Sequence, residues 1–437
     1  MQSPKYNILF PENDEYILLN TYSKKIVKMN KAKYAEVKSI LESDHPENCQ
    51  NTALIHRLKE FQFLIDEGDQ TLEKLQQNCV DLVMSKTLHI TMMMTYTCNF
   101  DCIYCFQNHI PNSLMTDEMV EKTLDFVRKE IREKKIERLY VEWFGGEPLI
   151  LKKKMLYLHK QFRTIAKEFH IPYYSRITTN GYELDLDTFN ELYKNHCFVY
   201  YISLDGSRTT HDRQRPLKNK SGTYDVIIKN LKAIHDHVSY KNFRIEIRIN
   251  NSSSTMKELG QFLAEFAKIF GNDSRFALVF DVVQDWGDRT KTMQDELIAK
   301  DQLEEPAMLA TKYNLNLVDF SFSSLETQIC QAAKKNAFSI FYDGSIIKCQ
   351  MALERDQYKD LNVVGNVVTG IDESRERVWV DDKFPDQCNH CVALPLCYGK
   401  KCVFTTKVKQ EKCTDIESAL IDQIKLEKQM SHEIEEI

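Results

Sequence analysis

Three cysteines on one short stretch are the residues of this chain best suited to chemistry. Cys98, Cys102 and Cys105 have the spacing C-x3-C-x2-C and directly follow the apolar run Leu88–Met94. Three thiolates on one loop can bind three irons of a [4Fe–4S] cube and leave the fourth iron open. A structural zinc site is the alternative, but it takes four ligands, usually from paired C-x2-C units. Here the first interval is longer and the nearby fourth candidate is His109. The spacing therefore favours an iron–sulfur cluster with an open iron.

Further polar motifs stand where successive apolar runs end. Gly145-Gly146-Glu147-Pro148 follows one run, Thr178-Thr179-Asn180-Gly181 the next and Ser203-Leu204-Asp205-Gly206 the one after, while Arg248 lies inside a fourth run. In parallel sheets, ligand sites collect beyond the carboxyl ends of the strands. A single Gly-Gly pair is usually only a turn. Motifs at several strand ends beside a cysteine triplet indicate one shared site.

Each of these motifs has a chemical role available. Glycines at 145 and 146 let the backbone approach a ligand closely, and Glu147 can accept a hydrogen bond from an ammonium group. Arg248 can bind a carboxylate in a bidentate pair, or it can form an ordinary ion pair with Glu246 or another neighbour. The short polar side chains suited to ribose hydroxyls are Asn180, Ser203 and Asp205.

A second group of cysteines lies in the last hundred or so residues. Its members are Cys330, Cys349, Cys388, Cys391, Cys397, Cys402 and Cys413. The first two frame Gly344 as C-x13-G-x4-C, and the next four read C-x2-C-x5-C-x4-C. Zinc is again the alternative, because C-x2-C is a common half-site. Seven ligands divide poorly into zinc tetrads, and the glycine spacing has no zinc rationale, so iron–sulfur ligation is favoured here too.

The elements that must position these motifs follow an alternating pattern between about residues 87 and 315. The expected strands are Leu88–Met94, Arg138–Trp143, Tyr174–Thr179, Phe198–Leu204, Phe243–Ile249 and Phe276–Val283. The expected helices are Asp117–Glu133, Lys152–Phe169, Asp187–Tyr193, Tyr224–His237, Thr255–Ile269 and Leu303–Tyr313. Six strand–helix units predict a parallel sheet with right-handed crossovers.

The first eighty residues have a different pattern. Three short strands are expected at Tyr6–Phe10, Glu15–Asn20 and Lys25–Met29, and three helices at Lys31–Leu41, Ala53–Phe61 and Gln70–Leu75. Turn residues separate the strands and indicate antiparallel pairing. The pattern fits any small winged-helix module. The charged segment Ile416–Ile437 predicts a solvated surface helix.

Composition excludes several classes of protein. The chain has 437 residues, so two or three domains are expected, and 43% of them are hydrophobic. A formal charge of −6 without a basic stripe argues against nucleic-acid binding. The sequence contains neither a signal peptide nor an apolar run of about 18 residues, so we expect no membrane span. Thirteen cysteines without export predict metal ligation in a cytoplasmic protein.

The cysteine triplet and the strand-end motifs resemble the radical S-adenosylmethionine (SAM) superfamily. The resemblance implies an α/β fold, a partial (β/α)6 TIM-like barrel. It also implies that the open iron binds SAM, which on reduction yields methionine and a 5′-deoxyadenosyl radical. Gly145–Pro148 would then contact the SAM amino group and Arg248 the SAM carboxylate. Asn180, Ser203 and Asp205 would face the ribose, and Tyr104 would lie near the adenine.

The C-terminal cysteines resemble the SPASM extension of this superfamily, which carries two auxiliary [4Fe–4S] clusters. The resemblance assigns Cys330, Cys349 and Cys402 to the first auxiliary cluster. It assigns Cys388, Cys391, Cys397 and Cys413 to the second. This chain departs from the family pattern by one extra residue before Cys402.

The resemblance to radical SAM/SPASM enzymes also implies a domain plan and a function. We expect a winged-helix-like peptide (leader) recognition domain at 1–80, the radical SAM barrel at 87–315 and a cysteine-rich SPASM domain at 325–437. Such enzymes mostly modify peptides, so the expected partners are a precursor peptide with a leader and a flavodoxin- or ferredoxin-like electron donor.

The stretch Thr95–Phe100 is similar to that of the streptide-type maturases, which join Lys and Trp carbons in a short peptide. The alternatives are thioether formation and then sulfatase-type oxidation of Ser or Cys. Gln350 stands where anaerobic sulfatase maturases usually carry an aspartate, which lowers that last option. A non-enzymatic metal-bearing recognition scaffold is a further alternative. A catalytic base is not identified, although Asp281, Asp285 and Glu354 are candidates by position.

Overall fold

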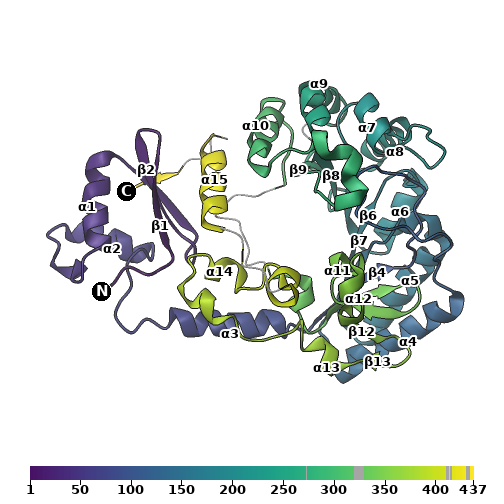
Figure 1. Ribbon diagram of the computed structural model, residues 1–437, viewed down its shortest axis with the longest axis horizontal. Coiled ribbons are helices and arrows are strands. Elements are labelled where there is room, and N and C mark those ends of the chain that lie inside the picture. The colour runs from purple at the N-terminus through teal and green to yellow at the C-terminus, as the bar shows by residue number, and fades with distance from the viewer. Residues whose placement is uncertain (272, 319–328, 410–412, 414–415, 430–433) are drawn as a thin grey trace. The chain divides into compact units, whose positions relative to one another are not determined.

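A computed structural model describes the chain from residue 1 to 437, except for 272, 319–328, 410–412, 414–415 and 430–433 (Figure 1). The chain forms two compact units. The first unit comprises Met1–Ser85, Asp319–Lys335 and Val378–Ile437, and the second comprises Lys86–Val318 and Asn336–Arg377.

A parallel sheet with a helix after each strand forms the core of the second unit. Its strands are β4 (Thr87–Met93), β5 (Arg138–Trp143), β6 (Tyr173–Thr179), β7 (Cys197–Ser203), β8 (Arg244–Asn251) and β9 (Phe276–Val282). They pair in sequence order, each parallel to the next. The helices are α4 (Asp117–Glu133), α5 (Lys152–Glu168), α6 (Leu186–Lys194), α7 (Arg208–Gln214), α8 (Tyr224–His237), α9 (Ser253–Phe270) and α10 (Glu304–Lys312). The six predicted strands and six predicted helices are confirmed; α7 is an addition.

Local sequence explains where these elements begin and what they bury. Thr116, Asp185, Ser207 and Ser252 each accept a backbone hydrogen bond as the N-cap of the following helix. Along β6, buried Tyr173, Ser175 and Ile177 alternate with more exposed residues, which turns one face of the sheet to the helices. Figure 1 shows α5, α6, α8 and α9 on the outer side of the row of strands. The inner side and the strand ends are thereby left for a site.

Four further strands extend this sheet beyond β4. They are β10 (Ala337–Phe341), β11 (Ser345–Ile347), β12 (Val363–Asn366) and β13 (Gly370–Ile371). Strand β10 pairs in parallel with β4, with Ala337 opposite His89, and the other three continue antiparallel. The short helices α11 (Gln350–Leu353), α12 (Asp356–Asn362) and α13 (Glu373–Glu376) accompany them. The strand order has two different ends, β13 and β9, so the barrel is partial.

The compact units cut across the predicted domain boundaries. Residues 336–377, expected within a C-terminal domain at 325–437, belong in space with the barrel. Residues 378–437 belong with the N-terminal segment instead. The expected boundary at 325 lies outside the described residues. The assignment of separate functions to 1–80, 87–315 and 325–437 stays a prediction.

The first unit contains the predicted module of three strands and three helices. Strands β1 (Asn7–Glu12), β2 (Glu15–Asn20) and β3 (Lys25–Met29) are antiparallel, and α1 (Lys31–Leu41), α2 (Thr52–Glu60) and α3 (Thr71–Val83) follow. Helix α3 is longer than predicted because Leu75, Cys79 and Val83 continue its buried stripe at intervals of four residues. The same unit contains α14 (Leu394–Cys397), α15 (Ile416–Gln429) and β14 (Glu435–Glu436).

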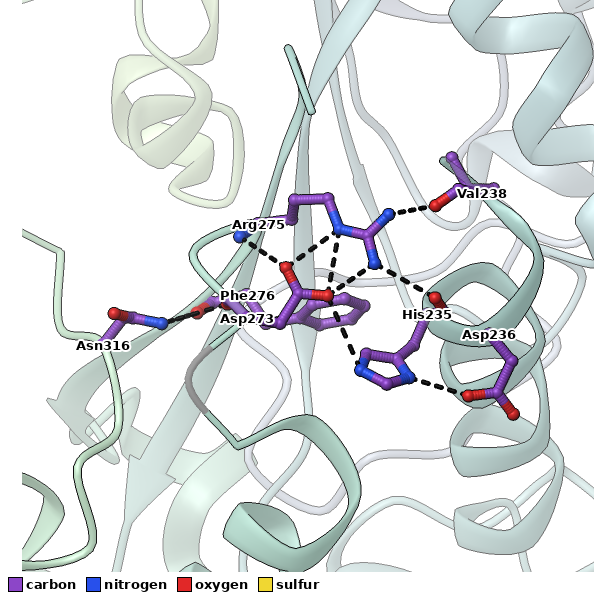
Figure 2. A network of polar contacts seen from close by, with 7 residues as sticks. All are labelled: His235, Asp236, Val238, Asp273, Arg275, Phe276 and Asn316. Carbon is purple, nitrogen blue, oxygen red and sulfur yellow. Dashed lines mark hydrogen bonds and ion pairs between the residues drawn. The ribbon is translucent and has the colours of Figure 1, made fainter. Parts of the chain in front are cut away.

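A polar network ties the end of α8 to the start of β9 (Figure 2). Arg275 Nε donates to both Asp273 carboxylate oxygens, at 2.9 and 3.0 Å, and its guanidinium also donates to the carbonyls of Val238 and His235. Burial alone would raise the pKa of Asp273, but the hydrogen bonds from Arg275 outweigh burial and lower it. Asn316 donates to the carbonyls of Asp273 and Phe276. The network lies at the amino end of β9, away from the strand ends that carry the motifs.

Among the described residues, no helix is both long and apolar enough to cross a membrane.

Candidate functional site

A cleft at the carboxyl ends of the parallel strands brings most of the predicted site residues together. The predicted residues that line it are Cys98, Cys102, Tyr104, Cys105, Gly145, Gly146, Glu147, Asn180, Ser203 and Arg248. Pro148 and Asp205 are not among the lining residues. The cleft therefore joins predicted residues that lie up to 150 positions apart in the sequence, from Cys98 to Arg248.

Backbone hydrogen bonds hold the cysteine loop to the segment that follows α7. Asp101 N–H donates to Pro216 O at 2.8 Å, Ile103 N–H to Gln214 O at 3.0 Å, and Lys218 N–H to Asn99 O at 3.1 Å. These contacts fix both ends of the interval between Cys98 and Cys102. Consequently the segment after α7, which sequence reasoning did not include, is part of the cluster loop's support.

The three thiols fit an iron–sulfur cluster by their donor type and by their shared environment. Burial, the nearby Glu147 and Cys102 raise the pKa of Cys98 well above its ordinary value. Burial also raises the pKa of Cys102 to about 12, although Arg215 opposes this shift. These two thiols of the metal-free protein are thus protonated near neutral pH, and metal binding must displace their protons.

The described side chains around the three cysteines do not form a site for a single metal ion. In the part of the chain that the structure describes, no three His, Cys, Asp or Glu side chains form a group that could hold one metal ion. His109 Nε2 lies 3.6 Å from Cys105 Sγ and also lines the cleft. In a [4Fe–4S] cube each thiolate binds a different iron, so the three thiols remain suited to that group.

The two glycines are required by the backbone that precedes Cys98. A Cβ on Gly146 would lie 2.1 Å from Thr97 O, and a Cβ on Gly145 would lie 2.4 Å from Thr95 O. Gly146 N–H donates to Thr95 O and Glu147 N–H donates to Thr97 O, both at 3.0 Å. The Gly-Gly pair therefore packs directly on the chain leading into the cysteine loop, in addition to lining the cleft.

Glu147 is held by donors of the protein itself. Its side chain is 1% exposed and accepts hydrogen bonds from Leu149 N–H at 2.9 Å, Thr179 Oγ1 at 2.7 Å and Asn180 N–H at 2.7 Å. Burial raises its pKa to about 7, although these hydrogen bonds act in the opposite direction. The carboxylate joins the end of β5 to the end of β6. Its expected contact with an ammonium group stays a prediction.

Asp205 takes part in a buried network instead of lining the cleft. It is fully buried and accepts hydrogen bonds from Tyr104 Oη and from the backbone and side-chain amides of Asn250. Asp205 N–H donates to His211 Nδ1 at 3.1 Å. The carboxylate therefore orients Tyr104 from behind. Of the three residues predicted to face a ribose, Asn180 and Ser203 line the cleft and Asp205 does not.

Arg215 is a functional candidate that sequence reasoning missed. It lines the cleft, is 7% exposed and donates from Nη1 to Tyr104 Oη at 2.8 Å. Its guanidinium carbon also lies 5.7 Å from the centre of the Phe100 ring. Among the described residues its Nε has no hydrogen-bond partner and its guanidinium forms no ion pair. A buried cation in this condition is suited to an anionic ligand.

Arg248 forms an ordinary ion pair with a neighbouring carboxylate, which was the second of its two predicted roles. Its Nη2 donates to Asp281 Oδ2 at 2.5 Å, while Glu246 pairs with Arg244 instead. The Arg248 side chain is 44% exposed, so this pair is partly hydrated. Of the two arginines in the cleft, Arg215 is thus the one without a carboxylate partner among the described residues.

Each of the three carboxylates predicted as candidate catalytic bases contacts another residue of the protein. Asp281 holds Arg248, Asp285 accepts from Thr290 Oγ1 at 2.9 Å, and Glu354 accepts from Asn108 N–H at 2.9 Å. None of these three carboxylates is among the residues that line the cleft. Trp286 and Phe106 do line it, with ring centres 5.7 Å apart. No sequence motif marked this aromatic pair.

The C-terminal cysteines of the first unit form two neighbourhoods. Burial first, and then the charges of Cys397, Cys391 and Cys413, raise the pKa of Cys388 to about 11. A Cβ on Gly399, at φ +65°, would lie 2.7 Å from Cys388 Sγ, so only glycine fits beside that sulfur. Cys330 and Cys402 form the other neighbourhood. Burial raises the pKa of Cys330 above its ordinary value, and the charge of the nearby Cys402 acts in the same direction. Cys349 belongs to the second unit. Their division into two auxiliary clusters stays a prediction.

Known proteins resemble this chain in both sequence and fold. Residues 92–247 match the family model of the Radical SAM superfamily. The cysteine-type anaerobic sulfatase-maturating enzyme of Clostridium novyi is 26% identical over 166 residues, which are 36% of this chain and 42% of that protein. The serine-type enzyme of Bacteroides thetaiotaomicron is 23% identical over 351 residues, 69% of this chain and 79% of its own. The chain thus spans less than half the length of the Clostridium relative.

A solved structure shares the fold. Native anSMEcpe with bound AdoMet and Cp18Cys peptide superposes with a TM-score of 0.56 at 17% identity, covering 78% of this chain and 96% of that one. At this identity the likeness concerns the fold alone. The matched segment, residues 92–247, carries the cysteine loop and the motifs at the ends of β5, β6 and β7.

Proposed function

We propose that this protein is a radical SAM enzyme that modifies a peptide, and that it installs a cross-link in a ribosomally made precursor. The observation that carries the proposal is the convergence of Cys98, Cys102 and Cys105 on one cleft with the buried Arg215, whose Nε has no hydrogen-bond partner among the described residues. The sulfatase-maturating relatives and the peptide bound to anSMEcpe support a peptide as substrate. Our preferred product is a Lys–Trp carbon–carbon bond.

The chain's own residues supply binding and orientation. A [4Fe–4S] cluster on the three thiolates, with SAM on its open iron, would supply a 5′-deoxyadenosyl radical that removes hydrogen from an unactivated carbon. Arg215 would pair with the anionic carboxylate of SAM, because it is buried and lacks an ion-pair partner in the described structure. Asn180 and Ser203 offer polar groups for a ribose. Asp205 fixes the Tyr104 hydroxyl through a hydrogen bond and so orients the ring beside the cleft.

The remaining cofactors and partners are part of the proposal. Cys330, Cys349 and Cys402 would hold one auxiliary [4Fe–4S] cluster, and Cys388, Cys391, Cys397 and Cys413 a second. An external flavodoxin- or ferredoxin-like protein would supply the electron. The N-terminal module at residues 1–80 would bind the leader. A cytoplasmic location is consistent with this chemistry, which requires reduced clusters.

Anaerobic reconstitution followed by reduction with SAM tests the enzyme proposal. We expect iron and sulfide to be incorporated and 5′-deoxyadenosine to form. The variant with Cys98, Cys102 and Cys105 all changed to Ala should make none. Replacing the auxiliary cysteines should spare SAM cleavage but stop formation of the peptide product. A protein that holds zinc and little iron after anaerobic handling would overturn the proposal.

Sulfatase-type oxidation is the second candidate, because two curated relatives are anaerobic sulfatase-maturating enzymes. Both a cross-link and the oxidation of a serine remove two hydrogens from a peptide, so mass alone does not separate them. An aldehyde-reactive hydrazide labels only the oxidised product. Labelling of a synthetic sulfatase peptide would favour this candidate over the cross-link. Thioether formation would instead be recognised by a sulfur linkage in fragmentation spectra.

A further inference from the structure

The short strand β14 closes one edge of the first unit's sheet. The strand order is β1-β2-β3-β14, and β14 runs parallel to β3, with Glu435 opposite Val27 and Glu436 opposite Lys28. In Figure 1 the yellow arrow of β14 lies against the purple strands of this sheet. A segment more than four hundred positions from β3 in the sequence therefore completes the sheet.

Side chains on both sides of β14 fix this docking. Ile437 N–H donates to Lys28 O at 3.2 Å, and the Ile437 side chain packs against the cluster that includes Val27 and Leu58. Glu435 forms an ion pair with Arg57 of α2. Ile434 packs on the other cluster of the unit, which contains Ile17 and Leu19. Ile434, Glu435 and Ile437 thus each make a separate contact with this unit.

Strands β1 and β3 differ in the main-chain hydrogen-bonding groups that they present to a further strand. Strand β1 carries Pro11, which has no backbone N–H to donate, and proline is a common protection of an edge. Strand β3 contains no proline over its five residues, Lys25–Met29, and β14 pairs with two of them. A longer extended segment can therefore form more main-chain hydrogen bonds with β3 than β14 does.

We propose that β14 is a built-in competitor for the β3 edge, where the leader expected on this module under the proposed function would pair. The identity of the partner rests on the proposed function; the site and the competition rest on the pairing of β14. The occupant must be extended, with an acidic residue that reaches Arg57 and an aliphatic residue that enters the cluster beside Val27 and Leu58. Binding of the peptide displaces β14 from the edge.

Competition by β14 lowers the affinity of the β3 edge for a free peptide, by an amount that can be estimated. A tethered segment has an effective concentration in the millimolar range when its linker spans the distance. The same segment supplied as a free peptide at micromolar concentration therefore cannot displace it from the full chain. Once β14 is removed, the free peptide should bind at least about tenfold more tightly.

The test uses the tail itself as the probe. A fluorescent peptide with the sequence of residues 430–437 (Met-Ser-His-Glu-Ile-Glu-Glu-Ile) is titrated into the full chain and into a chain shortened to residue 429. We expect saturable binding to the shortened chain and at least tenfold weaker binding to the full chain. If the shortened chain is insoluble, the full-length variant Glu435→Lys, which reverses the charge facing Arg57, takes its place.

Two controls separate edge pairing from nonspecific attraction. A peptide methylated on the Ile437 nitrogen cannot donate to Lys28 O and should lose binding. In the shortened chain, Arg57→Glu should weaken binding, whereas Lys59→Glu should not, because Lys59 pairs with Asp66 on the same module. Equal binding by the two chain lengths, or by the methylated peptide, would overturn the proposal. Iron content and deoxyadenosine formation need no peptide, so they test the proposed function independently.

Discussion

Replacing Gly146 with Ala should disturb the cysteine loop from the strand end beside it. The added Cβ would lie 2.1 Å from Thr97 O and 2.5 Å from Thr97 C, against an ordinary contact limit of 3.4 Å. The backbone before Cys98 must therefore move by about 1.3 Å. That movement breaks the two 3.0 Å hydrogen bonds from Gly146 N–H and Glu147 N–H, at about 0.5–1.5 kcal/mol each. With about 1–3 kcal/mol of overpacking, we expect a loss of about 2–6 kcal/mol in the free energy of unfolding.

Urea unfolding of the metal-free protein measures this loss, and iron per chain after anaerobic reconstitution measures its effect on the site. Gly260→Ala is the matched control. Gly260 lies inside α9, and its added Cβ would meet only Leu309 Cδ2 at 3.7 Å. This control should be neutral or more stable by up to about 1 kcal/mol. If Gly146→Ala unfolds at the wild-type urea concentration and loads iron fully, the packing argument is wrong.

Three further perturbations test the other contacts. Because folding raises the pKa of Glu147 from 4.5 to about 7, its contribution is present at low pH and lost as the pH rises through 7. The metal-free protein should lose up to about 3 kcal/mol between about pH 4.5 and 8 relative to Glu147→Gln, as measured by urea unfolding at each pH. Arg215→Gln should weaken SAM binding at least tenfold in equilibrium dialysis of the reconstituted protein. Arg248→Gln, which removes a partly exposed ion pair, should have a small effect. Equal effects of the two substitutions would refute the assignment of the SAM carboxylate to Arg215. Arg275→Ala should lower the free energy of unfolding by about 2–3 kcal/mol with iron loading unchanged, and a lower iron content in folded protein would contradict the separation of that network from the cleft.

The parallel sheet could be read from the sequence because its strands are buried and short. Arg138–Trp143 was predicted with the bounds that the structure shows, since an apolar run between polar segments has one simple interpretation. Strand β10 also reads as an apolar run, Ala337–Phe341, and all five residues are buried. Its partner, however, is β4, with Ala337 opposite His89. Periodicity carries no information on pairing across such a separation.

The candidate site was predictable in its residue types but not in their partners. The motifs identified Glu147, yet not that its carboxylate would meet Thr179 and two backbone amides. Asp205 was predicted to face a ligand and instead lies behind Tyr104, because burial depends on tertiary packing. Arg215 has no local signal, since Tyr104, which it contacts, is 111 positions away. Charged residues in loops are usually solvated, so only the structure identifies this one as buried.

The pairing of β4 with β10 has a consequence for biosynthesis. On the ribosome, the strand that leads into the cysteine loop emerges 248 positions before its neighbour, counted from His89 to Ala337. At roughly 5–20 residues per second, that interval lasts about 12–50 s. Throughout it, β4 presents one unpaired backbone edge, which can associate with other nascent chains. Insertion of iron into the loop is therefore expected to be a late, post-translational event, and chains truncated before residue 337 should aggregate when they are made.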